Sequence, residues 1–68
     1  MKLRVEMEQE EDGRWIAEVS DLPGVLAYGD SPAAARAGAQ ALALRVLADR
    51  LEHGESGGDL LSVSFEAA

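Results

Sequence analysis

Residues 21–32 read DLPGVLAYGDSP, a short apolar run enclosed by two groups of turn residues. Proline fixes φ and glycine accepts a positive φ, so Pro23 and Gly24 suit the centre of a type II turn. Such dense punctuation leaves room for one short strand, at Val25–Tyr28, between two sharp changes of chain direction. The turn and cap residues of this stretch are Asp21, Leu22, Pro23, Gly24, Gly29, Asp30 and Ser31.

Two runs of alternating apolar and polar residues come before this stretch, at residues 2–8 and 14–20. A period of two is typical of half-buried strands. The loop between the two runs is short and polar and ends at Gly13, so the two strands are predicted to form a hairpin. A further alternating run at residues 61–66 predicts a fourth strand.

A single long helix is predicted between the third and fourth strands. The hydroxyl of Ser31 can accept a hydrogen bond from the free N–H groups of the first helical turn. Pro32 suits the first helical position, because the backbone N–H that proline lacks would have no acceptor there. The alanine-rich segment that follows has high helix propensity up to about His53, and Gly54 suits the left-handed position after a helix. The polar residues 55–59 then indicate a connecting loop.

The predicted order is therefore β-β-β-α-β, an α+β fold in one domain that spans residues 1–68. The strands form one antiparallel or mixed sheet, and the single helix covers one of its faces. The helical crossover makes the fourth strand parallel to the first and third strands. The fourth strand lies beside one of these two, and the sequence pattern does not choose between them.

The chain has 68 residues and no cysteine, so neither a large core nor a disulfide stabilises it. Self-association is a common remedy at this size, and we expect a homo-oligomer. The net charge of −7 opposes binding to phosphate backbones and favours a basic protein partner. No apolar run resembles a membrane span or a signal peptide. We therefore expect a cytoplasmic protein that binds neither nucleic acid nor membrane.

On a helical wheel the long helix has two apolar faces. The first combines small and larger residues and suits packing on a sheet: Ala35, Gly38, Ala39, Leu42 and Val46. The second is a stripe of three leucines: Leu44, Leu47 and Leu51. Since one sheet does not readily cover both faces, the leucine stripe is either a flank, partly exposed or covered by the C-terminal loop, or a self-association surface.

The sequence shows no arrangement of side chains that predicts catalysis, a cofactor or a metal site. The lone histidine, His53, comes in the last helical turn, where the helix dipole favours a cation. Asp21 and Asp30 flank the third strand as turn residues. Acidic residues gather around the first hairpin loop, where they would steer a basic partner: Glu8, Glu10, Glu11 and Asp12. We expect a protein that is not an enzyme.

The order and spacing of these elements resemble the HicB-like antitoxin family. The matching positions run from the first hairpin into the helix: Gly13, Trp15, Ala17, Asp21-Leu22-Pro23-Gly24, Gly29-Asp30-Ser31, Ala35 and Ala39. The resemblance implies a domain similar to part of the RNase H fold, with the fourth strand beside the first. It also implies an antitoxin that binds a small basic mRNA-cleaving toxin, HicA, and masks its active site.

The chain departs from the family pattern in three places. Ser20 stands where proline is common, and Ala33 and Ala34 replace an acidic pair in the first helical turn. Many members carry a C-terminal DNA-binding segment, whereas this sequence ends at Ala68, and we expect no such segment. The alternatives are an oligomeric ligand- or protein-binding module without a toxin partner and, from other classes, a nucleic-acid-binding module or a divergent RNase H-like hydrolase.

Overall fold

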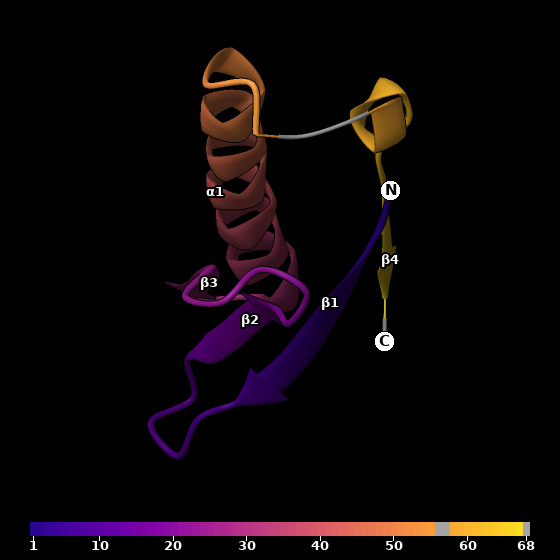
Figure 1. The fold of residues 1–68 in the computed structure, drawn as a ribbon. Coiled ribbons are helices and arrows are strands. Elements are labelled where there is room, and N and C mark those ends of the chain that lie inside the picture. Colours follow the sequence, from indigo (N-terminus) through magenta and orange to yellow (C-terminus); the bar gives the residue numbers. More distant parts are fainter. Residues whose placement is uncertain (56–57, 68) are drawn as a thin grey trace.

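The computed structural model describes residues 1–55 and 58–67, and the middle of the predicted connection at 55–59 lies outside these ranges. The described residues confirm the predicted β-β-β-α-β order and add a short 3₁₀ helix before the last strand (Figure 1). In chain order the elements are β1 (Lys2–Gln9), β2 (Trp15–Val19), β3 (Leu26–Gly29), α1 (Pro32–Glu52), η1 (Gly58–Leu61) and β4 (Ser64–Ala67).

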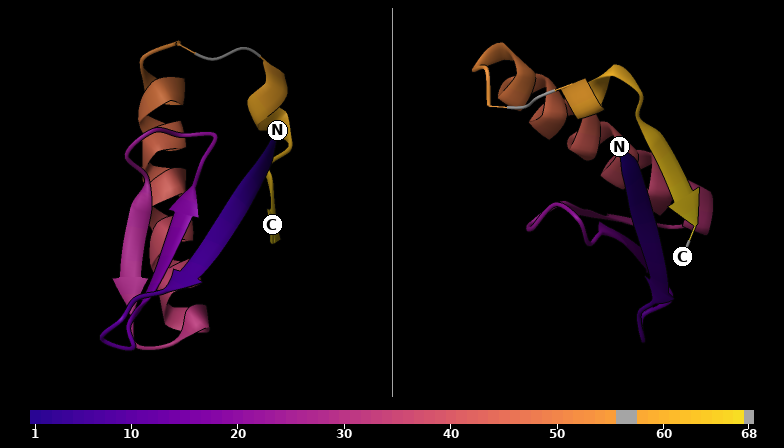
Figure 2. Two further views of the ribbon diagram at one scale, coloured as in Figure 1. Left: turned by 90° about the horizontal axis from the view of Figure 1, so that it is seen from below. Right: turned by 45° about the vertical axis from the view of Figure 1, so that its right-hand side comes forward.

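The sheet has the strand order β3-β2-β1-β4. β1 pairs antiparallel with β2, β2 pairs antiparallel with β3, and β4 pairs parallel with β1. The fourth strand thus lies beside the first, which is the position that the family resemblance implies. Helix α1 crosses one face of the sheet, mainly over β2 and β3 (Figure 2).

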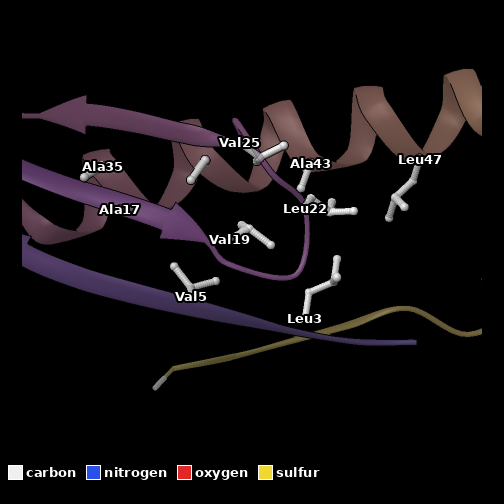
Figure 3. Close-up of a cluster of buried hydrophobic side chains, with 10 residues drawn as sticks. Leu3, Val5, Ala17, Val19, Leu22, Val25, Ala35, Ala43 and Leu47 are labelled. Atoms are coloured by element: carbon white, nitrogen blue, oxygen red, sulfur yellow. The ribbon is translucent and has the colours of Figure 1, made fainter.

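The core lies between α1 and the inner side of the sheet (Figure 3). Leu3 and Val5 of β1 and Ala17 and Val19 of β2 are buried on this side, as the alternating pattern predicts. The turn before β3 and the helix complete the cluster with Leu22, Val25, Ala35, Ala39, Ala43 and Leu47. The core is therefore built from a few aliphatic side chains and a row of alanines on the helix.

The DLPG segment forms the predicted tight turn. Gly24 has a φ of +83°, which suits the second central position of a type II turn, and the N–H of Val25 donates to the carbonyl of Leu22 at 3.1 Å. The Asp21 carboxylate accepts from the backbone N–H of Arg4 in β1 at 2.9 Å. Asp21 therefore begins the turn and also connects it to β1 through this hydrogen bond.

Gly29 ends β3 where the chain meets the first turn of α1. A Cβ placed on Gly29 would lie 2.5 Å from the backbone nitrogen of Ala35 and 2.9 Å from the carbonyl carbon of Ala34. Any side chain here would push the start of the helix away from β3. Glycine is therefore required at this position of the Gly-Asp-Ser motif, because only glycine lets α1 pack this closely against β3.

The hydroxyl of Ser31 caps the N-terminus of α1, as predicted, and accepts from the N–H of Ala34 at 3.1 Å. Ser31→Ala leaves this donor without its partner and is expected to lower the free energy of unfolding by about 1 kcal/mol. Chemical denaturation measures the loss. Ser31→Asp keeps an acceptor and adds a charge that the helix dipole favours, so it should retain wild-type stability. Equal losses in both variants would contradict the capping role.

Helix α1 ends at Glu52, within one residue of the predicted end at about His53. His53 is the C-cap, and Gly54 follows with a φ of +67°. The N–H of Gly54 donates to the carbonyl of Leu51, and the N–H of Glu55 donates to the carbonyl of Arg50. These two bonds form a Schellman motif, which ends the helix at a defined residue.

The buried face of α1 differs from the predicted one. Gly38 is exposed and Leu42 and Val46 are half-buried, whereas Ala43 and Leu47 are buried. The buried residues follow one another at steps of four, and each step turns by about 40° around the helix axis. This row follows the twist of the sheet beneath it. Leu47 therefore belongs to the core, and the prediction that placed it on a self-association surface was wrong.

The fourth strand begins later than the alternating pattern predicts. β4 starts at Ser64, and Leu61 lies in η1 with 93% of its surface exposed. The amino group of Met1 donates to the carbonyls of Asp59 and Ser62, so this segment bends around the start of β1 instead of running beside it. Strand pairing follows only after that bend.

Candidate protein-binding face of the sheet

The face of the sheet opposite α1 is open over β1, β2 and β3 in the described ranges. Where β1 pairs with β2 and β2 pairs with β3, register places six side chains on this open face: Leu26 and Tyr28 from β3, Ile16 and Glu18 from β2, and Glu6 and Glu8 from β1. Ile16 is the pairing partner of both Tyr28 and Glu8, while Glu18 is the partner of both Leu26 and Glu6. Apolar side chains thus lie over β3 and acidic ones over β1.

The acidic patch consists of Glu6, Glu8 and Glu18. Glu6 and Glu18 are direct cross-strand partners and both are exposed. Like charges at directly opposed positions destabilise a sheet, so this pair acts against the stability of the isolated domain. The patch lines a depression of about 250 Å³ together with Ile16 and Glu10. A basic side chain from a partner would relieve the repulsion.

The apolar strip consists of Ile16, Leu26 and Tyr28. Tyr28 is 49% exposed, and the guanidinium carbon of Arg14 lies 4.7 Å from the centre of its ring. This cation–π contact holds the ring in place. Beside this tyrosine lie the exposed Leu26 and the half-buried Ile16. Such a group is typical of the centre of a protein interface, where aromatic side chains contribute much of the binding energy.

Basic residues occupy the other end of the open face. Lys2 and Arg4 precede Glu6 on the same side of β1, and Lys2 forms an exposed ion pair of 3.9 Å with Glu66 in β4. These residues border a second depression of about 430 Å³, which Asp21 also lines. The open face therefore has an acidic end and a more basic end, so a partner with an uneven charge distribution would bind in one orientation.

The structure separates the four acidic residues predicted to steer a partner. Glu8 lies in β1 on the open face, and Glu10, which follows β1, lines the same depression as Glu8. Glu11 and Asp12 lie in the hairpin loop. Asp12 forms a 2.8 Å ion pair with the guanidinium of Arg14. The backbone N–H of Arg14, and then its side chain, hold the pKa of Asp12 below the ordinary value of 3.8. Asp12 is thus paired within the loop, while Glu8 joins the acidic patch.

Glu6, Glu18 and Tyr28 were not singled out by the sequence pattern. Alternation already placed Glu6 and Glu18 on the outer sides of their strands. The missing information was the register, which brings the two carboxylates opposite each other, because a slip of one residue would change every partner. Counting the same number of residues outward from the hairpin loop along both strands would have predicted that Glu6 and Glu18 are opposed.

The remaining candidate positions have structural contacts. His53 lies near Asp49 of the same helix, with Nδ1 2.8 Å from its carbonyl oxygen and 3.4 Å from its carboxylate. Among residues 1–55 and 58–67, histidine and acidic side chains form no group of three or more that would hold a metal ion. Across the same residues, no helix combines the length and apolar character needed to cross a membrane.

No family model matches the sequence, and the searches of curated proteins and solved structures gave no match either. The class of protein therefore follows from the fold and its open face. This is a small α+β domain whose helix covers one side of the sheet and leaves a charged, partly apolar surface on the other. Such a surface suits a protein partner.

Removing one charge from the Glu6–Glu18 pair is expected to stabilise the isolated domain. Glu18→Gln should raise the free energy of unfolding by roughly 0.2–1 kcal/mol at low salt, because the opposed like charges are lost. The gain should shrink as salt screens the repulsion. Glu11→Gln makes the same charge change in the hairpin loop and serves as the control in thermal denaturation. A Glu18→Gln variant no more stable than the control would contradict the repulsion.

Proposed function

We propose that this chain is a non-catalytic, HicB-like antitoxin-type domain that binds a small basic RNA-cleaving toxin and masks its RNA site. The observation that carries the proposal is the open sheet face, where the acidic patch adjoins the apolar strip. A protein that binds RNA presents Lys and Arg to the phosphates. Its RNA site is therefore complementary in charge to Glu6, Glu8 and Glu18. Masking follows because the antitoxin occupies the basic residues that RNA needs.

The topology supports the same proposal. β4 pairs with β1, as the HicB-like resemblance implies, and the motif residues Gly24, Gly29 and Ser31 have defined roles in this fold. A fold does not by itself define a function. For that reason the proposal depends on the open face and its chemistry, and the topology is secondary support.

The charge distribution favours fast association with a basic protein. Three arginines against Asp49 and Glu52 give residues 31–54 a local charge of +1, which leaves −8 for the rest of the chain. This negative field attracts a basic partner from a distance and raises the association rate. The rate should fall steeply with ionic strength, which stopped-flow measurements on the complex would show.

A second candidate is an oligomeric protein- or ligand-binding module without a toxin partner. The depression at the basic end of the open face favours it, because Lys2 and Arg4 lie there beside the carboxylates of Asp21 and Glu66. A small ligand with both charges would find complementary groups at this place. If this second candidate is correct, the acidic patch would bind a protein other than a toxin, or would bind no protein.

Capture from cells with the tagged full chain distinguishes the two candidates. The antitoxin proposal predicts that a basic protein of fewer than about 100 residues, the size of a single small domain, is retained. After separation in denaturant and refolding, this protein should cleave RNA, and adding the chain back should stop cleavage. Retention of a protein that does not cleave RNA would favour the second candidate.

A further inference from the structure

An uncharged stripe runs along α1 from the side opposite the core at Ala37 and Ala41 to the last turns of the helix, where Leu51 follows the buried row. This outer stripe consists of Ala37, Ala41, Leu44, Ala48 and Leu51, all exposed. Leu44 is 48% and Leu51 is 58% exposed. The five positions are separated alternately by four and three residues, which is the spacing of the contact positions in a two-helix coiled coil. The stripe therefore has the pattern of a helix that packs against a second helix.

The domain is more extended than a monomer of its size. Its radius of gyration is 12.6 Å, against about 11 Å expected for a compact chain of this length. Its accessible surface is 4504 Å², against about 4,100 Å² expected for this mass. The C-terminal turns of α1 extend beyond β2 and β3 (Figure 1). The excess surface thus includes the part of the helix that bears the two leucines.

The charge distribution indicates which partner covers the stripe. A basic toxin is attracted to the acidic patch and not to an uncharged helix face. Two copies of this chain repel each other through most of their surface, because the residues outside 31–54 carry −8 in each copy. The helix is close to neutral, and Arg45 and Glu52, which follow the two leucines, have opposite signs. The helix is therefore the surface at which two copies meet with the least repulsion.

We propose that the chain forms a two-fold dimer in which the outer stripes of two α1 helices pack together. A two-fold axis brings the same surface of both copies into contact. Alanines let the helix axes approach closely, and Leu44 and Leu51 fill the space between them. The stripe spans residues 37–51, about 21 Å of helix. Such a contact is smaller than a standard interface, so the dimer is weak, with a Kd in the tens of micromolar or higher.

The dimer does not depend on the toxin proposal, because the stripe lies on α1 and the acidic patch lies on the face of the sheet that α1 does not cover. Leu47 also has a separate role, since it is 4% exposed and belongs to the buried row. The contact leaves both open sheet faces free to bind a partner. Each result below therefore bears on the dimer alone.

Sedimentation of the full chain from about 10 µM to 1 mM tests the proposal. The wild-type mass should rise from one chain toward two, and added salt should strengthen the dimer by screening the repulsion between two copies of charge −7. Leu44→Glu and Leu51→Glu should each leave a monomer at every concentration. Leu61→Glu, which makes the same change at an exposed leucine outside α1, should dimerise like the wild type.

Ala48→Arg provides a second test that removes no existing contact. It adds bulk and charge between Leu44 and Leu51 and should abolish the dimer while circular dichroism shows a folded chain. The proposal is overturned by a wild-type protein that stays monomeric at about 1 mM. It is also overturned if the folded Ala48→Arg variant dimerises as well as Leu61→Glu does.

Discussion

Leu47→Ala is expected to lower the free energy of unfolding by about 2–4 kcal/mol. Leu47 is 4% exposed and belongs to the same buried cluster as Leu3 and Leu22. Truncation removes its burial and leaves a cavity that the helix and sheet backbones cannot close. For a domain of this length the melting temperature should fall by on the order of 10–20 °C. Thermal and chemical denaturation measure both quantities.

Leu51→Ala is the matched control, because it is the same substitution one step further along the same row of the helix. Leu51 is 58% exposed, so its truncation should change the free energy of unfolding by no more than about 0.5 kcal/mol. Both variants are compared at about 1 µM, well below the Kd of the proposed dimer. Equal losses for the two leucines would show that the buried row does not end at Leu47.

Reversal of two charges in the acidic patch is expected to weaken toxin binding by about 100-fold or more. Glu6→Lys with Glu18→Lys replaces two carboxylates by ammonium groups that would face a basic site. Each lost charge contact accounts for roughly a tenfold loss, about 1.4 kcal/mol, and the new repulsion adds to it. Calorimetric titration of the captured toxin with each variant measures the Kd.

Glu11→Lys with Glu55→Lys is the control for net charge, because both residues are exposed and neither lines the depression of the acidic patch. Each lysine substitution adds two positive charges, so both double variants carry −3 in place of −7. Their long-range attraction to a basic protein is therefore similar, and only the position of the change differs. The control variant should lose less than about tenfold in affinity. Equal losses would mean that net charge, and not the acidic patch, determines binding.

Most of the fold was predictable because its signals are local. Alternation over residues 2–8 and 14–20 places the first two strands within one residue or two of β1 and β2. Gly24 and Gly54 have the positive φ that their positions in the sequence predict, and Ser31 has the predicted capping bond. Each of these features depends on backbone conformation and on neighbours a few residues away.

The features that depend on tertiary contacts were not predictable from the pattern. Alanine occurs on almost every side of α1, so a helical wheel does not choose the buried row, and the twist of the sheet places Leu47 inside. Leu61 continues an alternating run, but contacts with Met1 place it in η1. The Glu6–Glu18 pair likewise depends on the register between two strands, which the outline of a hairpin leaves open.

Titration of the chain into an RNA-cleavage assay with the captured toxin tests the masking function most directly. The proposal predicts that cleavage falls in proportion to added chain and stops near one chain per toxin. It also predicts that the Glu6→Lys/Glu18→Lys variant fails to inhibit at this ratio, whereas the Glu11→Lys/Glu55→Lys variant inhibits. A toxin that binds the wild-type chain yet cleaves RNA at an unchanged rate would contradict the proposal.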